Sequence, residues 1–423
     1  MLSSFRLNIK NNIRFNQVVK LLSWNFLGIP LGIVTNIIVT KFLGPKVYGD
    51  YMFVNNIFTI AILILNFGIF QAANRALVLT NDTEKAREYY GSELIIMGGI
   101  YILMSISLYI YAAFDPNISE KGIKIELFYL IPFSWIYLLI QYFEVLFQAD
   151  NKIDLLVKTR YFPKVGFFVS AILIYLFFKN FTGNKLFIIW GFYITTQIVV
   201  YFFVIKKIKV SLKNSRKRIR EIWEHNKSFG FNVYLGSLFS NVFSQLSGLL
   251  ISYFAIDNSG VGFYTLALTL VSPLSLIPNV IATTHYKDFS TLNSIPKKLV
   301  KITFLISITA LFFLLLIIPF FIHYFYSKEF EVVIKLSFIV SVGVMFYGIS
   351  DFFNRFLGAH GNGKALRNSS ILVGITILIS NIIFIPLFHE TGAALTFLLA
   401  GLVYFLSIQF YYRKMVKESS IKI

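Results

Sequence analysis

The chain has 423 residues, of which 57% are apolar and only 14% are charged, against roughly 25% charged in soluble domains. The absence of cysteine excludes disulfides, thiolate catalysis and cysteine-based metal sites, and the five histidines include no H-x-x-x-H pair that would favour a metal centre. A net charge of +19 would suggest nucleic-acid binding in a soluble protein, but Lys and Arg also gather in the cytoplasmic loops of membrane proteins. The composition therefore predicts a membrane protein without metal, cofactor or nucleic acid.

About a dozen apolar stretches follow one another along the chain, each long enough to cross a bilayer. Phe304–Phe321 and Ala393–Phe410 carry no charged side chain over 18 residues, the length that a helix needs for roughly 30 Å of hydrocarbon. We therefore predict an all-α polytopic membrane protein. The predicted spans are 17–40, 49–73, 91–113, 126–148, 162–179, 185–206, 228–255, 260–284, 299–323, 332–354, 365–388 and 391–412.

Charge asymmetry gives an independent test of this topology. If both termini lie in the cytoplasm, 31 of the 39 Lys and Arg residues fall in the cytoplasmic segments or the adjoining turns, and only eight in the external ones. The positive-inside rule requires an excess of this kind, and omitting any one span would reverse the side of every later loop. The sequence therefore predicts about twelve spans with both ends inside.

A long basic connection divides the chain near its middle. Residues 207–227 separate an N-terminal part, 1–206, from a C-terminal part, 228–423, and each part holds six predicted spans. Two halves of six spans are typical of transporters built from repeats. We predict two six-helix lobes joined by a basic cytoplasmic linker that also contacts lipid headgroups.

A short motif occurs at the same place in both halves. Aligning Gly49-x-Tyr51 with Gly262-x-Tyr264 gives an offset of 213 residues, about half of the chain. Both halves number their spans from the cytoplasmic side. The predicted repeat is therefore parallel, with its axis along the membrane normal.

Polar and small side chains form stripes on single faces of three predicted spans. Such residues either join helices to one another or face a polar lumen, and the sequence leaves both interpretations open. We favour a lumen because the stripes lie at the start of both halves. The stripes are Asn25, Gly28, Gly32 and Asn36; Ser237, Asn241, Gln245 and Gly248; and Thr265, Thr269, Ser272 and Asn279.

Few ionisable residues lie near the predicted membrane. Glu144 is about one turn inside its span, and Asp351 and Arg355 are placed to form an ion pair one turn apart. Arg75 follows the second span directly, and Lys287 takes the equivalent place in the second half. The simplest interpretation of Arg75 is a side chain that reaches toward the headgroups, and binding of an anionic substrate is the alternative.

Four stretches carry a resemblance to a known family. They are FLGPKVYGDYMF (42–53), NFGIFQAANRALV (66–78), SGVGFYTLAL (259–268) and the segment 356–400, which contains a Gly361-Asn362-Gly363 turn. In this order and spacing they resemble the Wzx-type polysaccharide flippases, the O-antigen and capsule repeat-unit transporters of the multidrug/oligosaccharidyl-lipid/polysaccharide exporter superfamily. TTHYKDFS stands where that family would have a P-x-x-S end after the eighth span.

The resemblance implies two six-helix lobes around a central cavity, as in the multidrug exporters, and transport by alternating access in the bacterial inner membrane. It implies an undecaprenyl-diphosphate-linked oligosaccharide as substrate, H⁺ or Na⁺ as a coupling ion, and a polysaccharide polymerase as an assembly partner in surface polysaccharide (lipopolysaccharide) biosynthesis. A diphosphate requires cations and the sugars require amides and hydroxyls. The candidate substrate-binding residues are Arg75, Lys287, Asn25, Asn36, Asn241, Gln245 and Glu144.

Three alternatives stay open at this stage. A multidrug antiporter of the same superfamily would have the same architecture, but it would need more acidic groups in its lumen than Glu144 alone. A membrane glycosyl polymerase usually carries a long external loop, which this chain lacks, and a lipid-II flippase usually carries more spans. No G-x-x-x-x-G-K-[ST] loop is present, so we expect neither ATP-driven pumping nor enzymatic activity.

Overall fold

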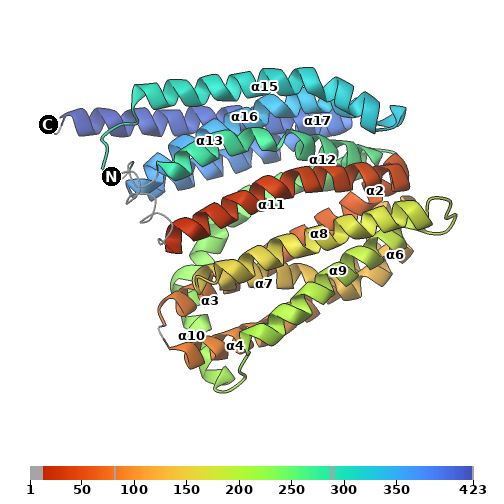
Figure 1. The fold of residues 1–423 in the computed structure, drawn as a ribbon, viewed down its shortest axis with the longest axis horizontal. Coiled ribbons are helices and arrows are strands. Elements are labelled where there is room, and N and C mark those ends of the chain that lie inside the picture. The colour runs from red at the N-terminus through yellow and green to blue at the C-terminus, as the bar shows by residue number, and fades with distance from the viewer. Residues whose placement is uncertain (1–12, 81, 286–288, 290, 422–423) are drawn as a thin grey trace, which may run out of the picture. The chain divides into compact units, whose positions relative to one another are not determined.

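The computed structural model describes residues 13–80, 82–285, 289 and 291–421, and in this part of the chain every regular element is helical. In the first half the helices are α2 (Ile13–Leu65), α3 (Ile69–Val78), α4 (Thr83–Phe114), α5 (Pro116–Glu120), α6 (Lys124–Leu130), η1 (Ile131–Phe133), α7 (Trp135–Ala149), α8 (Ile153–Phe177) and α9 (Lys185–Ile208). In the second half they are α10 (Ser215–His225), η2 (Asn226–Gly230), α11 (Phe231–Phe254), α12 (Ser259–Val271), α13 (Pro273–Thr284), α15 (Lys297–Phe325), η3 (Lys328–Phe330), α16 (Val332–Ala359) and α17 (Gly363–Ile421). Figure 1 shows these helices along the chain.

Most of these helices are long and apolar enough to cross a membrane. Eight helices of the described residues pass this test, and the bent pair Lys124–Phe133 with Trp135–Ala149 makes a ninth. Two of the eight, Leu27–Leu65 and Gly363–Glu418, have 39 and 56 residues, or about 58 and 84 Å, enough for two crossings each. The count of twelve spans stays a prediction. The all-α membrane fold is confirmed.

The two longest helices turn where the sequence predicts a gap between spans. α2 contains Gly44 at φ 73°, ψ 171°, and α17 contains His389 at φ 50°, ψ −125°. Gly44 precedes Pro45, and a glycine adopts this backbone conformation without the steric cost of a Cβ atom. Gly44 and Pro45 lie in the gap between the predicted spans 17–40 and 49–73, so the chain breaks where the sequence predicts.

One predicted span is interrupted. The sequence predicts a continuous helix over 49–73, but α2 ends at Leu65 and α3 begins at Ile69. Phe67 and Gly68 have positive φ angles of 46° and 79°, and the Asn66 side chain accepts a hydrogen bond from the Gly68 amide at 2.9 Å. The local hydrogen bonding of Asn66 thus competes with the helix, which apolarity alone does not reveal.

The described chain forms two compact units. Unit 1 consists of Met1–Leu43 and Ala61–Leu235, and unit 2 of Gly44–Ile60 and Gly236–Ile423. In unit 1, α7 packs against α3, α4, α8 and α9. In unit 2, α16 packs against α12, α13, α15 and α17, and Figure 1 shows α15, α16 and α17 running side by side. α7 and α16 are thus the most central helices of their units. They correspond to the fourth predicted span of the first half and the fourth of the second half.

Glycines allow the helices of unit 2 to approach closely. A Cβ atom on Gly343 of α16 would lie 3.1 Å from the Cα of Leu398, and one on Gly401 would lie 2.8 Å from the Gly343 carbonyl oxygen. Small residues at such contacts are typical of helix packing in membranes, where burial of apolar surface gives no driving force between helices.

The segment Gly44–Ile60 of α2 is joined to the start of α12 by a buried polar network. The Asn258 side chain donates to Asp50 Oδ1 at 2.8 Å and accepts from the Ser252 hydroxyl at 2.6 Å. A Cβ atom on Gly49 would lie only 1.9 Å from the Asn258 carbonyl oxygen. The first motif of the predicted repeat therefore packs directly against the residues that precede the second.

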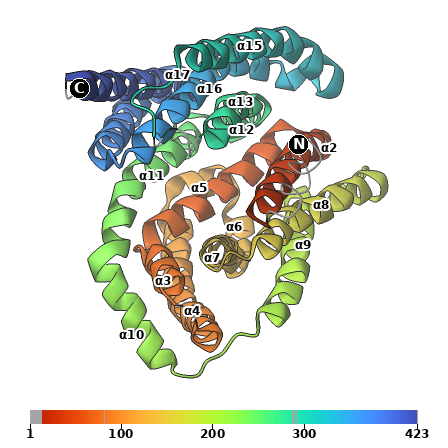
Figure 2. The ribbon, with the colours of Figure 1, turned by 60° about the vertical axis from the view of Figure 1, so that its left-hand side comes forward.

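α10 is held against α4 by a buried arginine. Arg218 donates to Glu88 at 2.8 Å and to Glu221 at 2.6 Å, and only 9% of its side chain is exposed. Burial would raise the pKa of Glu221, but hydrogen bonds from Tyr89 and Arg218 and the Arg218 charge together lower it below its ordinary value of 4.5. In Figure 2 the chain passes from α9 through the loop at the bottom of the view into α10. Residues 215–225 of the predicted linker thus fold as the helix α10, which is part of unit 1.

Candidate functional site: two polar cavities

Unit 1 contains a cavity of about 460 Å³ between α7, α8 and α9. Glu144 of α7 and Arg160 of α8 face each other in it as an ion pair, with the Arg160 Nε donating to Glu144 Oε2 at 2.7 Å and a second bond from the guanidinium to the other carboxylate oxygen. Gln148 donates to Glu144 at 2.8 Å. We call this the Arg160 cavity.

A second cation lies one turn further along α8. Lys164 lines the cavity four residues after Arg160, on the same helical face. Among the described residues it forms no ion pair, and its Nζ lies 5.4 Å from the centroid of the Tyr161 ring. With one carboxylate and two cations in its wall, the cavity has a net charge of +1.

The wall of the Arg160 cavity is fixed by aromatic packing. Trp24 of α2 stacks on Tyr161 with ring centroids 5.6 Å apart, and a Cβ atom on Gly28 would lie 2.8 Å from the Tyr161 ring. Gly28 belongs to the predicted stripe of the first span. In the structure, this glycine provides space for an aromatic ring that lines the cavity.

Unit 2 contains a cavity of about 330 Å³ with an uncharged polar wall. We call it the Gln245 cavity. Amides, hydroxyls and aromatic rings line it, and none of the described side chains in its wall carries a charge at neutral pH. The polar and aromatic residues are Asn56, Ser244, Gln245, Ser247, Tyr264, Thr265, Tyr347, Thr396 and Phe397.

Hydrogen bonds and close packing hold this wall in place. Ser247 and Asn381 are hydrogen-bonded at 3.1–3.2 Å, and Tyr347 packs on Phe397 with ring centroids 5.0 Å apart. A Cβ atom on Gly248 would lie 1.8 Å from the Asn56 amide nitrogen, so a larger residue here would require the Asn56 side chain to move. Gln245 and Gly248 belong to the predicted stripe of the seventh span, and these two residues line the cavity.

The predicted site residues fall in different places. Glu144 lines the Arg160 cavity and Gln245 lines the Gln245 cavity. Asn36 lies in α2, partly buried, and its carbonyl oxygen accepts a hydrogen bond from Thr40. The structure does not describe the side chains of Asn25 and Asn241, and Lys287 lies outside the described residues.

Arg75 lines neither cavity. It is exposed near the end of α3, and its guanidinium lies 4.7 Å from the centroid of the Phe229 ring. α3 packs against α7, α10 and η2. α3 begins directly after the Asn66–Gly68 break, where Gly68 lies against the backbone of Gly230.

Asp351 and Arg355 form no direct ion pair among the described residues, although the charge of Arg355 acts on the Asp351 carboxylate. Asp351 accepts a hydrogen bond from the Tyr404 hydroxyl at 3.1 Å. Asn354 donates to the same hydroxyl at 2.6 Å. The hydrogen-bond partner of Asp351 is thus Tyr404 of α17, whereas the sequence suggested Arg355, one turn along the same helix.

Sequence reasoning missed Arg160 and Lys164. Their spacing of four residues at the start of a predicted span was visible, and Lys164 lies inside the span 162–179. An intramembrane cation is itself a signal of function. The pairing of Arg160 with Glu144 depends on the packing of α7 against α8, which no local pattern reveals.

Comparison with solved structures shows which fold the chain has. The chain shares the fold of transporters and flippases of the multidrug/oligosaccharidyl-lipid/polysaccharide exporter superfamily. A lipid II flippase MurJ in an inward closed conformation matches with a TM-score of 0.72 and 16% identity, covering 95% of this chain and 90% of that one. An inward-facing multidrug transporter of the MATE family matches at 0.69 and 15%, covering 92% and 95%. A superfamily transporter from Pyrococcus furiosus matches at 0.56 and 14%, covering 93% of both chains.

The family follows from the sequence comparison. The chain belongs to the polysaccharide biosynthesis protein family, whose model matches residues 16–286. A comparison with curated proteins found no match. The predicted resemblance to polysaccharide flippases of this superfamily is confirmed, and the protein is a multi-pass membrane protein of a transporter and flippase fold.

Proposed function

We propose that this protein moves undecaprenyl-diphosphate-linked oligosaccharide repeat units from the cytoplasmic to the outer leaflet of the bacterial inner membrane by alternating access. The observation that carries the proposal is the Arg160 cavity in a chain of this family. Two nitrogens of the Arg160 guanidinium are held by Glu144, so its remaining N–H groups are the ones that would bind an anionic oxygen, and Lys164 one turn away adds a point charge. Both groups suit a diphosphate.

The side chains of the Gln245 cavity are of the kind that would bind the sugars of the proposed substrate. Amides and hydroxyls donate and accept hydrogen bonds at the same site, as sugar hydroxyls require, and aromatic rings offer apolar faces. We also propose that residues 1–206 and 228–423 form the two transport lobes and that both ends of the chain lie in the cytoplasm.

A multidrug antiporter is the second candidate, and the charge of the cavity disfavours it. A cationic drug would need a free carboxylate, but Glu144 is already paired with Arg160, and Lys164 would repel the drug. Transport coupled to H⁺ or Na⁺ is compatible with either candidate. We also propose that the flippase has an assembly partner such as a polysaccharide polymerase and that it is not an enzyme.

The proposal is tested by deleting the gene in its native host. We expect lipid-linked repeat units to accumulate in the inner leaflet, surface polysaccharide to disappear, and glycosyl transfer to the lipid carrier to continue. Complementation with the intact gene is the control. Normal surface polysaccharide combined with sensitivity to cationic dyes would replace the flippase by the antiporter.

A further inference from the structure

A second kind of cavity lies on the surface of unit 2, where α15, α16 and α17 meet. It encloses about 870 Å³, which is within the size range of small-molecule sites. Phe304, Phe353 and Phe405 line its apolar part, and Arg413, Lys414 and Lys417 line one end. Neither the Arg160 cavity nor the Gln245 cavity shares a lining residue with it. We call it the α15–α17 groove.

The apolar part of the groove is firmly packed. Phe353 is buried and lies 4.9 Å, ring to ring, from Tyr412, whose hydroxyl accepts a hydrogen bond from the Ile295 amide at 3.0 Å. That bond fixes the segment before α15 next to the end of α17. Phe304 and Phe405 form an edge-on pair across the two helices at 6.1 Å.

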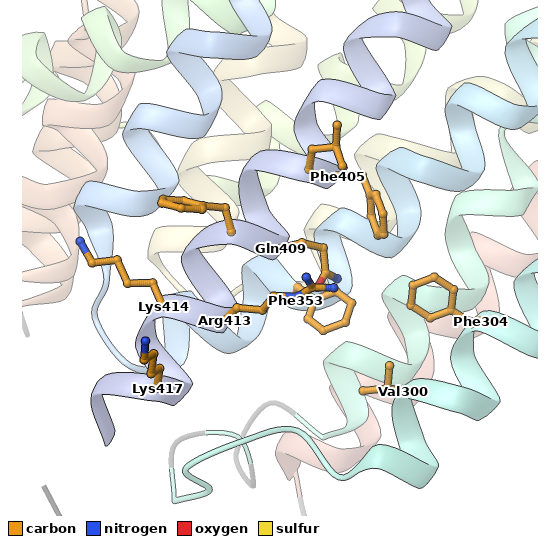
Figure 3. A pocket seen from close by; sticks show the side chains of 10 residues that line it. Val300, Phe304, Phe353, Phe405, Gln409, Arg413, Lys414 and Lys417 are labelled. Atoms are coloured by element: carbon orange, nitrogen blue, oxygen red, sulfur yellow. The ribbon is translucent and has the colours of Figure 1, made fainter. Parts of the chain in front are cut away.

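The charged end combines cations from two helices. Figure 3 shows the Arg413 side chain extending toward Gln409 and Phe353, with Val300 and Phe304 across the groove and Lys414 and Lys417 at its outer edge. Among the described residues no ion pair involves Arg413 or Lys414. The first turns of α15 add exposed Lys297, Lys298 and Lys301, and Glu418 is the nearest acidic residue along α17.

Exposure of the wall shows what the groove opens onto. Leu406 and Phe410 line it and are 57% and 63% exposed, and both lie within a predicted membrane span. Large apolar side chains left exposed on a spanning helix face lipid. By the predicted topology, the charged end lies at the cytoplasmic headgroup level and the phenylalanines lie deeper in the hydrocarbon.

We propose that the α15–α17 groove binds one anionic phospholipid of the cytoplasmic leaflet, with its phosphate at Arg413 and Lys414 and an acyl chain along Phe304 and Phe405. Cations at the headgroup level attract anionic lipids, and an arginine can engage two phosphate oxygens. Aromatic and aliphatic side chains below them match a hydrocarbon chain.

The polyprenyl lipid of the transported substrate has the same phosphate and hydrocarbon chemistry, but the groove suits it less. A lipid-linked oligosaccharide also needs groups that bind several sugars, and Gln409 is the only neutral polar side chain in the wall. The structure therefore assigns the groove to a bulk phospholipid. This inference does not depend on which substrate the protein transports.

The experiment uses the full chain in nanodiscs and takes advantage of its lack of cysteine. A single Leu406→Cys, labelled with a bimane fluorophore, reports on the groove, and Phe313→Cys on the exposed face of α15 is the control position. Phospholipids with a nitroxide on the acyl chain are then titrated, either as phosphatidylglycerol or as phosphatidylcholine. The fluorescence of the label decreases when a nitroxide lies in contact with it.

We expect half-maximal quenching at Leu406→Cys at a roughly tenfold lower mole fraction of phosphatidylglycerol than of phosphatidylcholine, and no preference at Phe313→Cys. Arg413→Gln with Lys414→Gln should reduce the preference to about twofold or less, because these two cations hold the headgroup. Arg216→Gln with Lys217→Gln, two exposed cations on α10, should leave it unchanged.

Three results would overturn the inference. Equal quenching by the two phospholipids at Leu406→Cys would show that the groove does not select a headgroup charge. Displacement of the labelled phosphatidylglycerol by undecaprenyl phosphate at a lower mole fraction than by unlabelled phosphatidylglycerol would assign the groove to the carrier lipid. Failure of unlabelled phosphatidylglycerol to displace the probe would also count against a defined site.

Discussion

Gly262 of α12 packs directly against Gly49 of α2, because a Cβ atom added to Gly262 would lie 3.1 Å from the Gly49 Cα. These are the two residues that the offset of 213 pairs as equivalents. In a twofold arrangement a residue meets its own equivalent only near the axis. The contact is compatible with the predicted repeat, in which the two Gly-x-Tyr motifs correspond.

The first prediction concerns this contact. Gly49→Ala should destabilise the protein by about 1–3 kcal/mol or more, because its Cβ atom would lie 1.9 Å from the Asn258 carbonyl oxygen and the backbone would have to move. Gly99→Ala in α4, with no atom within 4 Å of the added Cβ, is the matched control and should be neutral or stabilising. Thermal denaturation in detergent measures both. An unchanged midpoint for Gly49→Ala would contradict the packing described.

The second prediction separates a structural from a binding role for Arg160. Arg160→Gln leaves the Glu144 carboxylate without its partner. Because both side chains are about a third exposed, we expect a loss of only about 1–2 kcal/mol, together with loss of transport. Glu144→Gln with Arg160→Gln should restore stability, since neither charge then remains, but should not restore transport. Complementation of a flippase-deficient strain and immunoblotting measure the two effects, and recovery of both in the double variant would remove Arg160 from the substrate site.

Lys164 provides the third prediction. Lys164→Gln should reduce transport by roughly tenfold at a normal protein level, because it removes a phosphate contact and breaks no ion pair of the described residues. Lys158→Gln on the same helix, which does not line the cavity, is the control and should complement fully. Equal activity of the two variants would mean that the net charge of the cavity does not matter.

The fourth prediction concerns Arg75, which we retain as a candidate for capture of the diphosphate outside the two cavities. Arg75→Lys keeps the charge near Phe229 but loses the planar fork, so it should lose more activity than the charge alone would suggest. Arg75→Ala should lose most activity. If the side chain only reaches toward the headgroups, Arg75→Lys will be silent. Complementation at matched expression distinguishes these outcomes.

The fifth prediction concerns the docking of α10. Arg218→Met should cost about 3 kcal/mol, because it leaves Glu88 and Glu221 without the buried guanidinium. Arg220→Gln, which breaks an exposed pair with Glu224 on the same helix, should cost less than about 1 kcal/mol. The denaturation midpoints of the two variants give the comparison. Similar losses would show that the burial of Arg218 does not matter.

The network of Arg218, Glu88 and Glu221 also predicts how the stability of the folded protein changes with pH. Because the pKa of Glu221 is lowered in the folded protein, its contribution to stability is present above the ordinary value of 4.5 and is lost as the pH falls through the lowered pKa. The denaturation midpoint should therefore decrease below about pH 4.5 in the native protein and change less in Arg218→Met. A parallel decrease in both proteins would assign the pH dependence to other groups.

Much of this fold could be predicted from the sequence because a bilayer imposes a simple length and polarity rule on each helix. The rule places α15 and α16 within a few residues, and turn chemistry places the breaks at Gly44 and Gly361. It fails at Asn66, where a side-chain hydrogen bond ends a helix inside an apolar run. The site was only partly predictable, since the stripe at Gln245 is a local pattern whereas the pairing of Glu144 with Arg160 is tertiary.

The network of Asp50 and Asn258 has a consequence for the way the chain is made. The two residues are 208 positions apart, and at a synthesis rate of 5–20 residues per second Asn258 emerges roughly 10–40 s after Asp50. Until Asn258 is made, Gly44–Ile60 lacks this packing partner, even after the first six predicted spans are complete at residue 206. A ribosome that stalls between the two halves would therefore leave a polar helix surface unpaired in the membrane, where quality-control proteases act on incomplete chains.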